Sequence, residues 1–140
     1  MKRSLKIMQY LNSAVEGIKS IAGRLSTGTL LVELEKEAWS VYKDCESAVF
    51  LIKLEISDVE APDNTALDWS FDRSDYAIFL AEDHLKEALA AMEKGELDKA
   101  LQQARIARNI MAEVCSQVKK ENLRAARESW KKNRSQLAQH

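Results

Sequence analysis

Apolar side chains recur at alternating steps of three and four residues along most of this 140-residue chain. That spacing places them on one face of an α-helix, which turns once in about 3.6 residues. The first such stripe consists of Met8, Leu11, Val15, Ile18, Ala22 and Leu25. We predict a helix from about Lys2 to Arg24, followed by a turn at "STGT". Because no segment shows the strict alternation of a β-strand, the chain is expected to be all-α.

Three further stripes predict three more helices. The second should run from Thr29, a suitable N-cap, to about Val59, before Pro62 ends it. The third should occupy residues 74–94, with Gly95 in the left-handed conformation that closes a helix. The inward-facing residues of the fourth should be Leu97, Leu101, Ala104, Ala107, Met111, Val114, Cys115 and Val118. Short connections favour antiparallel neighbours, so we expect an up-and-down antiparallel four-helix bundle.

The fourth helix should be longer than the bundle. Paired antiparallel with a third helix that starts at Ser74, it is covered only as far as residues 116–118, and its stripe breaks there. A new stripe of Leu123, Ala126, Trp130 and Leu137 then begins. We therefore divide the domain into a four-helix core, residues 1–118, and a basic amphipathic extension, residues 119–140. The extension is expected to overhang the core or to bend.

The extension is the main candidate site. Its segment "KKENLRAARESWKKNR", residues 119–134, has seven basic and two acidic side chains. The residues proposed to bind a polyanion or a partner are Lys120, Arg124, Arg127, Trp130, Lys131 and Arg134. The five basic ones lie on one stripe, about 100° around the helix from the apolar stripe. Three interpretations stay open. The apolar stripe packs on the protein's own core and leaves its charges in water, or the segment binds RNA or DNA through phosphates, or it docks in a partner groove or on a membrane surface.

Charge is unevenly distributed along the chain. Residues 1–32 carry a net charge of +4, residues 33–98 carry −12, and residues 99–140 carry +7. This pattern can mark an anionic partner, or it can mean that the ends and the middle attract each other. In an up-and-down bundle the first and fourth helices are neighbours. Lys2, Arg3 and Lys6 should then lie near the extension and form one basic side with it.

Two segments are apolar on most sides, "AVFLIKLEI" at residues 48–56 and "YAIFLA" at residues 76–81. A helix that is apolar all round must be covered all round. In a hairpin these segments would lie side by side, near Trp69 and Phe71. The candidate oligomer-interface residues are Phe50, Leu51, Leu54 and Phe79. Either the extension or a second subunit should cover them, so a homodimer stays open.

Little in the sequence indicates chemistry. Cys45 and Cys115 fall on apolar helical positions, which favours buried free thiols over a disulfide or a redox pair. His84 lies near acidic residues, but the Glu-x-x-His motifs of a di-iron bundle are missing, so we expect no metal site. There is no Gly-rich phosphate loop and no nucleophile motif, so we expect no cofactor and no enzyme activity. The apolar runs are too short for a membrane span, and polar residues interrupt any signal peptide, which favours a cytoplasmic protein.

One stretch resembles two known families. "ALAAMEKGELDKALQQARIA" is similar to the helix–turn–helix of tetratricopeptide repeats, with Gly95, Leu97 and Ala100 at matching positions. With "AEDHLKEAL" ahead of it, it also resembles hairpins of the HEPN nucleotide-binding and RNase superfamily. That second resemblance implies a catalytic Arg and His four to six residues apart, a spacing found here for Arg134 and His140.

These features together predict a non-enzymatic helical bundle that acts through protein–protein contacts, as an adaptor or assembly subunit. The alternative is a phosphate-directed RNA- or DNA-binding protein that uses the first and fourth helices. A HEPN-like RNase variant is a remote third hypothesis.

Overall fold

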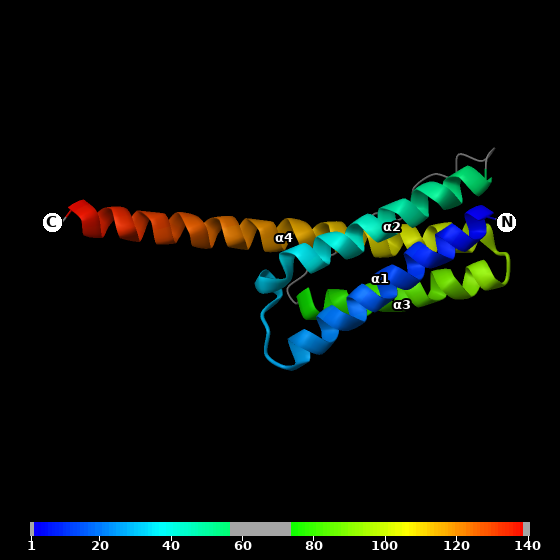
Figure 1. Cartoon of the computed structure of the whole chain (residues 1–140), viewed down its shortest axis with the longest axis horizontal. Helices are drawn as coiled ribbons and strands as arrows, with labels where there is room; N and C mark the ends of the chain where they lie inside the picture. Colours follow the sequence, from blue (N-terminus) through cyan, green and yellow to red (C-terminus); the bar gives the residue numbers. More distant parts are fainter. Residues whose placement is uncertain (1, 57–73, 139–140) are drawn as a thin grey trace.

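The computed structural model describes residues 2–56 and 74–138 of the chain (Figure 1). These residues form α1 (Lys2–Ser26), the 3₁₀ turn η1 (Leu31–Leu34), α2 (Glu35–Ile56), α3 (Ser74–Glu93) and α4 (Leu97–Ala138). No strand occurs in the two described ranges. The prediction of an all-α bundle with four helices is confirmed.

Local chemistry accounts for the helix ends. Gly95 has φ +73°, and the amide of Glu96 donates to the Ala91 carbonyl at 2.9 Å, which closes α3 as the sequence predicts. The prediction that Thr29 caps the second helix is wrong. The chain enters α2 through η1, where the Glu33 carboxylate accepts the Leu30 amide at 3.1 Å. The Glu33 carboxylate, and not the Thr29 hydroxyl, therefore accepts a free amide at the start of this segment.

Polar contacts between helices fix their relative directions. Arg3 pairs with Glu55 and Arg24 with Glu37, so α1 and α2 are antiparallel. The contacts Arg108–Glu46 and Asn122–Val32 make α2 and α4 antiparallel, and Lys99–Glu87 and His84–Gln103 do the same for α3 and α4. It follows that α1 and α4 run parallel to each other, as do α2 and α3.

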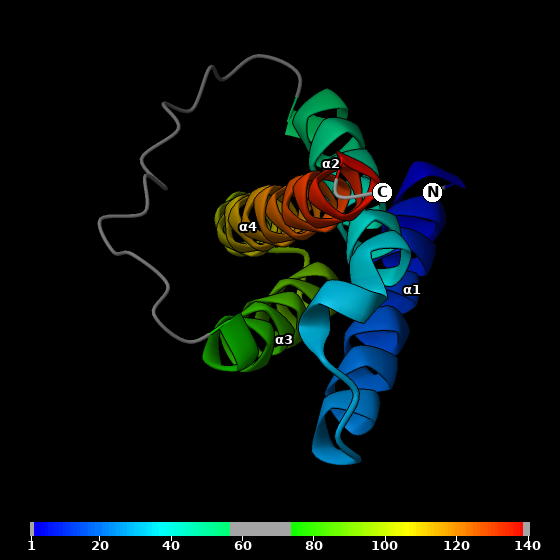
Figure 2. The same ribbon diagram turned by 90° about the vertical axis from the view of Figure 1, so that its left-hand side faces the viewer.

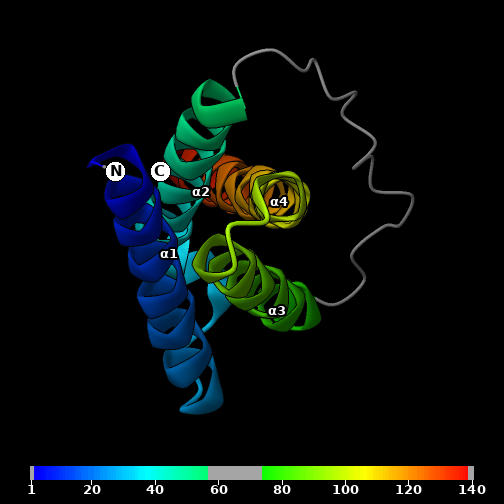
Figure 3. The same ribbon diagram turned by 90° about the vertical axis from the view of Figure 1, so that its right-hand side faces the viewer.

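The order of the helices around the bundle differs from the sequential one that we predicted. The neighbours of α4 are α2 and α3, and α1 also packs on α2 and α3. Seen along the bundle, α2 and α3 lie diagonally opposite each other, as do α1 and α4 (Figures 2 and 3). Every adjacent pair is still antiparallel. The reason is chain length: α2 and α3 are joined by 17 residues, which extended reach roughly 56 Å, so the two helices need not form a hairpin.

The core largely follows the predicted stripes. Exceptions include Met8, Ala22, Leu25, Leu97 and Cys115, which are only partly buried, and Ile110, which is fully buried although the fourth stripe did not include it. The largest fully buried side chains of the core are Ile7, Leu11, Ile18, Ile21, Leu34, Ile52, Ile78, Leu85, Ile110, Met111, Val41 and Val49. Gly17 allows α1 to approach α2 closely. A Cβ atom added at Gly17 would lie 2.7 Å from Cγ2 of Val41. The β-branched Val41 is stiff at χ1 and cannot turn away easily.

Replacing Gly17 with alanine should therefore destabilise the bundle. Overpacking costs about 1–3 kcal/mol, against a gain of about 1 kcal/mol in helix propensity. Denaturant unfolding should show a net loss of up to about 2 kcal/mol. The matched control is Gly23→Ala in the same helix, where nothing lies within 4 Å of the added Cβ and a small gain is expected. In a Val41→Ala background the loss from Gly17→Ala should disappear. Equal gains from Gly17→Ala and Gly23→Ala in the wild-type chain would disprove the close contact.

Candidate functional site

The last part of α4 extends beyond the other helices (Figure 1). Val118 is the last buried residue of the helix, and residues 123–137 are all exposed. At the boundary, the side-chain amide of Asn122 donates to the Val32 carbonyl at 3.0 Å. We refer to residues 119–138 as the α4 arm. The helix continues through the boundary without a break, so the arm lies in line with the core part of α4 (Figure 1).

All five predicted basic residues of the arm, Lys120, Arg124, Arg127, Lys131 and Arg134, are exposed to solvent. Within the described residues none of them forms an ion pair. Cations of the described residues that do pair with acidic side chains of another helix include Arg3, Arg24, Lys99 and Arg108. Neutralisation of the basic stripe by α2 and α3 is therefore not observed in the described part of the chain.

The apolar stripe of the arm is exposed as well. The exposed fraction is 61% for Trp130 and 77% for Leu137, and Leu123 is also half exposed. The guanidinium carbon of Arg134 lies 5.3 Å from the centre of the Trp130 ring, so the two side chains pack on each other. The interpretation in which this stripe covers the protein's own core does not hold for the described structure. The arm presents both a basic stripe and an apolar stripe to solvent.

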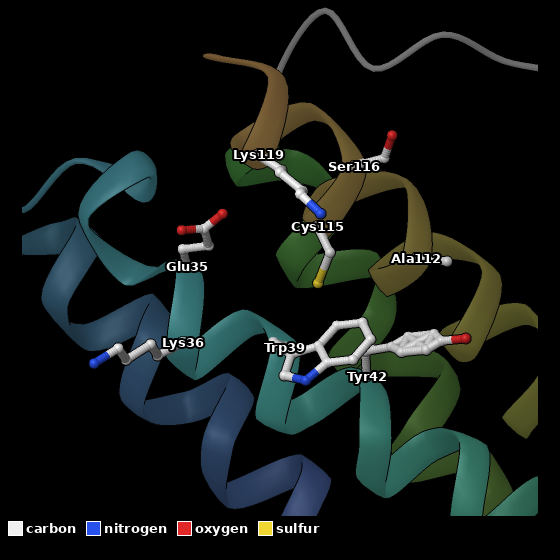
Figure 4. A pocket seen from close by; sticks show the side chains of 8 residues that line it. All are labelled: Glu35, Lys36, Trp39, Tyr42, Ala112, Cys115, Ser116 and Lys119. Carbon is white, nitrogen blue, oxygen red and sulfur yellow. The ribbon is translucent and has the colours of Figure 1, made fainter. Parts of the chain in front are cut away.

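A hollow of about 600 Å³ lies at the base of the arm, between α2 and α4 (Figure 4). Its lining residues are Glu35, Lys36, Trp39, Tyr42, Ala112, Cys115, Ser116 and Lys119. The rings of Trp39 and Tyr42 are nearly parallel, with centres 5.1 Å apart, and the Cys115 thiol points toward Trp39. We did not predict this hollow. In the sequence, only Trp39 could have indicated it, because this large aromatic residue lies outside the apolar stripe of its own helix.

The chemistry of the hollow is that of a binding surface. Burial, with a smaller effect of the Glu35 carboxylate, raises the pKa of the Cys115 thiol to about 11. The thiol is thus protonated at neutral pH and is a poor nucleophile. The Tyr42 hydroxyl donates to Glu46 at 2.8 Å, and this hydrogen bond raises its pKa. What remains is an apolar and aromatic floor with charged side chains at the rim.

The four residues predicted to form an oligomer interface do not form one patch in the structure. Phe50, Leu54 and Phe79 are exposed, and Leu51 packs half-buried against the core. Phe50, Leu51 and Leu54 belong to α2, whereas Phe79 belongs to α3, and these two helices are diagonal rather than adjacent. The arm does not cover them: Phe50 and Leu54 lie toward the end of α2 that is farther from the arm, and Phe79 near the start of α3 is still 58% exposed. A hollow of about 570 Å³ beside Phe50 is formed with Lys6 and Tyr10 of α1.

The predicted position of the start of α1 is also wrong. Lys2, Arg3 and Lys6 were expected beside the arm. Arg3 instead pairs with Glu55 near the end of α2, at the opposite end of the bundle from the arm. Because α1 and α4 are parallel and diagonal, they do not form a single basic side.

The remaining candidates show no reactive constellation. Cys45 is buried and Cys115 partly buried, and both are free thiols. Nδ1 of His84 lies 2.6 Å from Oε1 of Gln103, a contact that joins α3 to α4. Among the described residues, no three His, Cys, Asp or Glu side chains are grouped as metal ligands.

The helices of residues 2–56 and 74–138 include none that is long and apolar enough to cross a membrane. The predictions for Trp69, Phe71 and His140 lie outside the described residues. The resemblances to tetratricopeptide repeats and to the HEPN superfamily have no support beyond the sequence residues quoted for them. In comparisons with protein-family models, curated proteins and solved structures, no match to this chain is found.

Proposed function

We propose that the protein is a non-enzymatic helical bundle that works through protein–protein contacts, with the α4 arm as its docking element. The single observation that carries the proposal is the exposure of both stripes on the arm, whose apolar side chains include Trp130 and Leu137. In the described structure residues 123–137 are all exposed, so the arm adds nothing to the buried core of the bundle. An exposed apolar stripe beside a charged one is the common form of a helix that docks into a partner.

The energetics of the arm support the same proposal. An isolated helix shorter than about 12–15 residues is marginal in water, and longer ones depend on packing or on ion pairs. The arm has seven basic and only two acidic residues, and no ion pair forms within its described part. A partner that covers the apolar stripe would supply the missing stabilisation.

The experiment compares the full chain with a chain shortened to residues 1–122. The shorter chain keeps the Asn122–Val32 contact and the whole core, so its circular dichroism and melting should match those of a folded bundle. Each is immobilised and used to capture proteins from lysate of the source cells, and each captured protein is then produced and titrated directly. The proposal expects a partner that binds the full chain and not the short one. Direct binding that is the same for both chains would refute a role for the arm.

A second candidate function is phosphate-directed binding to RNA or DNA. It is favoured by the five exposed, unpaired basic side chains on one stripe of the arm. The described residues show no base-reading or base-stacking element beside them, so we expect any binding to be directed to the backbone.

If the arm contacts about four phosphates, the log–log plot of affinity against salt should have a slope of about −3 to −4. Changing Arg124, Arg127 and Lys131 together to glutamine should flatten that slope by about two to three, while the melting temperature stays unchanged. Filter binding or fluorescence anisotropy with short RNA and DNA probes measures both. Absence of binding at low salt would eliminate this second function.

A further inference from the structure

The hollow at the base of the arm and the apolar stripe of the arm belong to one continuous face of α4. Starting in the hollow and moving along the helix, this face is formed by Ala112, Ser116, Leu123, Ala126, Trp130 and Leu137. Lys119 and Asn133 complete a strict alternation of four and three residues. Such a seven-residue repeat is the seam along which a second helix packs. We refer to it as the α4 seam.

The seam has the dimensions of a helix-docking surface. Ala112 and Leu137 are 25 residues apart, which at about 1.5 Å per residue is roughly 37 Å. Trp39 and Tyr42 of α2 form a wall beside its first two turns, so the seam begins as a groove and continues as an open face. Its outer end is also slightly hollowed, between Trp130 and Leu137.

Along residues 119–137, the charges that border the seam lie on one side only; one repeat earlier on that side, beside the hollow, stands the acidic Glu113. Lys120, Arg127 and Arg134 follow one flank at intervals of seven residues. The opposite flank has Asn122, Ser129 and Gln136, which are uncharged. Flanking positions of this kind set the choice of partner in paired helices. A helix lying on the seam thus meets a row of three cations along one edge, and the complementary residues are Asp or Glu.

A second copy of the arm does not fit this pattern. The arm has a net charge of +5. In antiparallel self-pairing the basic flank faces itself, with Arg127 opposite Arg127 of the second copy. In parallel self-pairing it faces the uncharged flank, so no acidic residue meets it in either case. Like charges directly across an interface oppose association.

We propose that the α4 seam receives an acidic amphipathic helix of a partner protein. The partner helix has apolar residues at three- and four-residue spacing, carboxylates along one edge, and a large apolar side chain that fills the hollow against Trp39. This inference rests on the proposed docking function and names the chemistry of the partner.

The test uses two synthetic, fluorescently labelled 26-residue peptides and the full-length protein. Both peptides have leucine and isoleucine at the seam positions. One has glutamate at the flanking positions and its twin has lysine there. Fluorescence anisotropy should show that the glutamate peptide binds at least about tenfold more tightly than the lysine peptide. Binding of the glutamate peptide should weaken with added salt.

Matched variants of the protein locate the contact. Changing Lys120, Arg127 and Arg134 together to glutamine should weaken binding of the glutamate peptide about tenfold or more. The control triple, Arg124→Gln, Lys131→Gln and Lys132→Gln, removes the same charge away from the seam and should change it less than about threefold. Trp39→Ala should weaken binding about tenfold. Ser116→Glu should also weaken binding of the glutamate peptide. Because Ser116 is exposed in the hollow, this change should not disturb folding, so it serves as a check if Trp39→Ala impairs the fold.

Three results would overturn the inference: equal binding of both peptides, equal effects of the two triple variants, or no binding of the glutamate peptide at about 100 µM, a limit weaker than the micromolar affinity of a typical transient contact. If the capture experiment still finds a partner that binds only the full chain, the proposed docking function is retained. Only the proposal that the partner is an acidic helix that fills the hollow is then rejected. If RNA or DNA binds instead, with equal sensitivity to both triples, the docking function fails as well.

Discussion

Replacing Ile110 with alanine should lower the free energy of unfolding by about 2–5 kcal/mol, because Ile110 is fully buried where α4 packs in the bundle. The change removes buried methyl groups and leaves a cavity that the surrounding helices can only partly close. In a domain with a total stability of about 5–15 kcal/mol, this loss should shift the melting temperature by many degrees. Chemical denaturation followed by circular dichroism measures it directly.

The comparison variant is Phe50→Asp. From the sequence alone, this change is expected to unfold a monomer or dissociate a dimer. In the described structure Phe50 is 59% exposed, so we expect the chain to remain folded with a change below about 1 kcal/mol. A loss as large as that of Ile110→Ala would mean that Phe50 is covered in solution. Light scattering on the wild-type chain would then show whether a second copy covers it.

Raising the pH above 9 should destabilise the protein through Cys45. Burial raises the pKa of this thiol from 9.0 to about 12. A raised pKa means that the folded state holds the proton more tightly than the unfolded state does. The resulting stabilisation is complete below about pH 9 and is lost as the pH rises toward 12. Between pH 8 and pH 11 the loss attributable to Cys45 should be about 3 kcal/mol.

The control for this prediction is Cys45→Ala, since tyrosines, lysines and Cys115 also titrate in the same range. At pH 8 the variant should be less stable than the wild type by about 1 kcal/mol, from the lost sulfur packing. By pH 11 it should be the more stable of the two. Parallel stability curves for both chains from pH 8 to pH 11 would contradict a thiol held in its neutral form by burial.

The sequence predicts those features that depend on neighbouring residues. The end of α3 follows from Gly95, and the buried stripe of α4 ends at Val118 as its spacing indicates. Three- and four-residue spacing determines which face of a helix is apolar, and burial of that face is the largest stabilising term available to it. The exposure of Trp130 could not be derived in this way. An apolar stripe requires cover but does not specify what provides it.

Helix order and the hollow depend on distant contacts, and here the sequence argument fails. It treated the connection between α2 and α3 as tight, which placed Phe50 beside Phe79 and the start of α1 beside the arm. A connection of 17 residues places no such restriction, and packing selects the diagonal order instead. The hollow requires Trp39 of α2 to lie beside Cys115 of α4, a pairing that no local pattern encodes.

Hydrogen exchange along α4 of the free protein tests the central claim most directly, namely that the arm is an unpartnered helix attached to a stable core. The amides of residues 101–118 lie in the buried part of the helix and should exchange only through global unfolding. Those of residues 123–137 should exchange at least about a hundredfold faster, at every protein concentration. Equal protection along the whole of α4 would contradict the claim, because it would mean that the protein itself, or a second copy of it, already covers the arm.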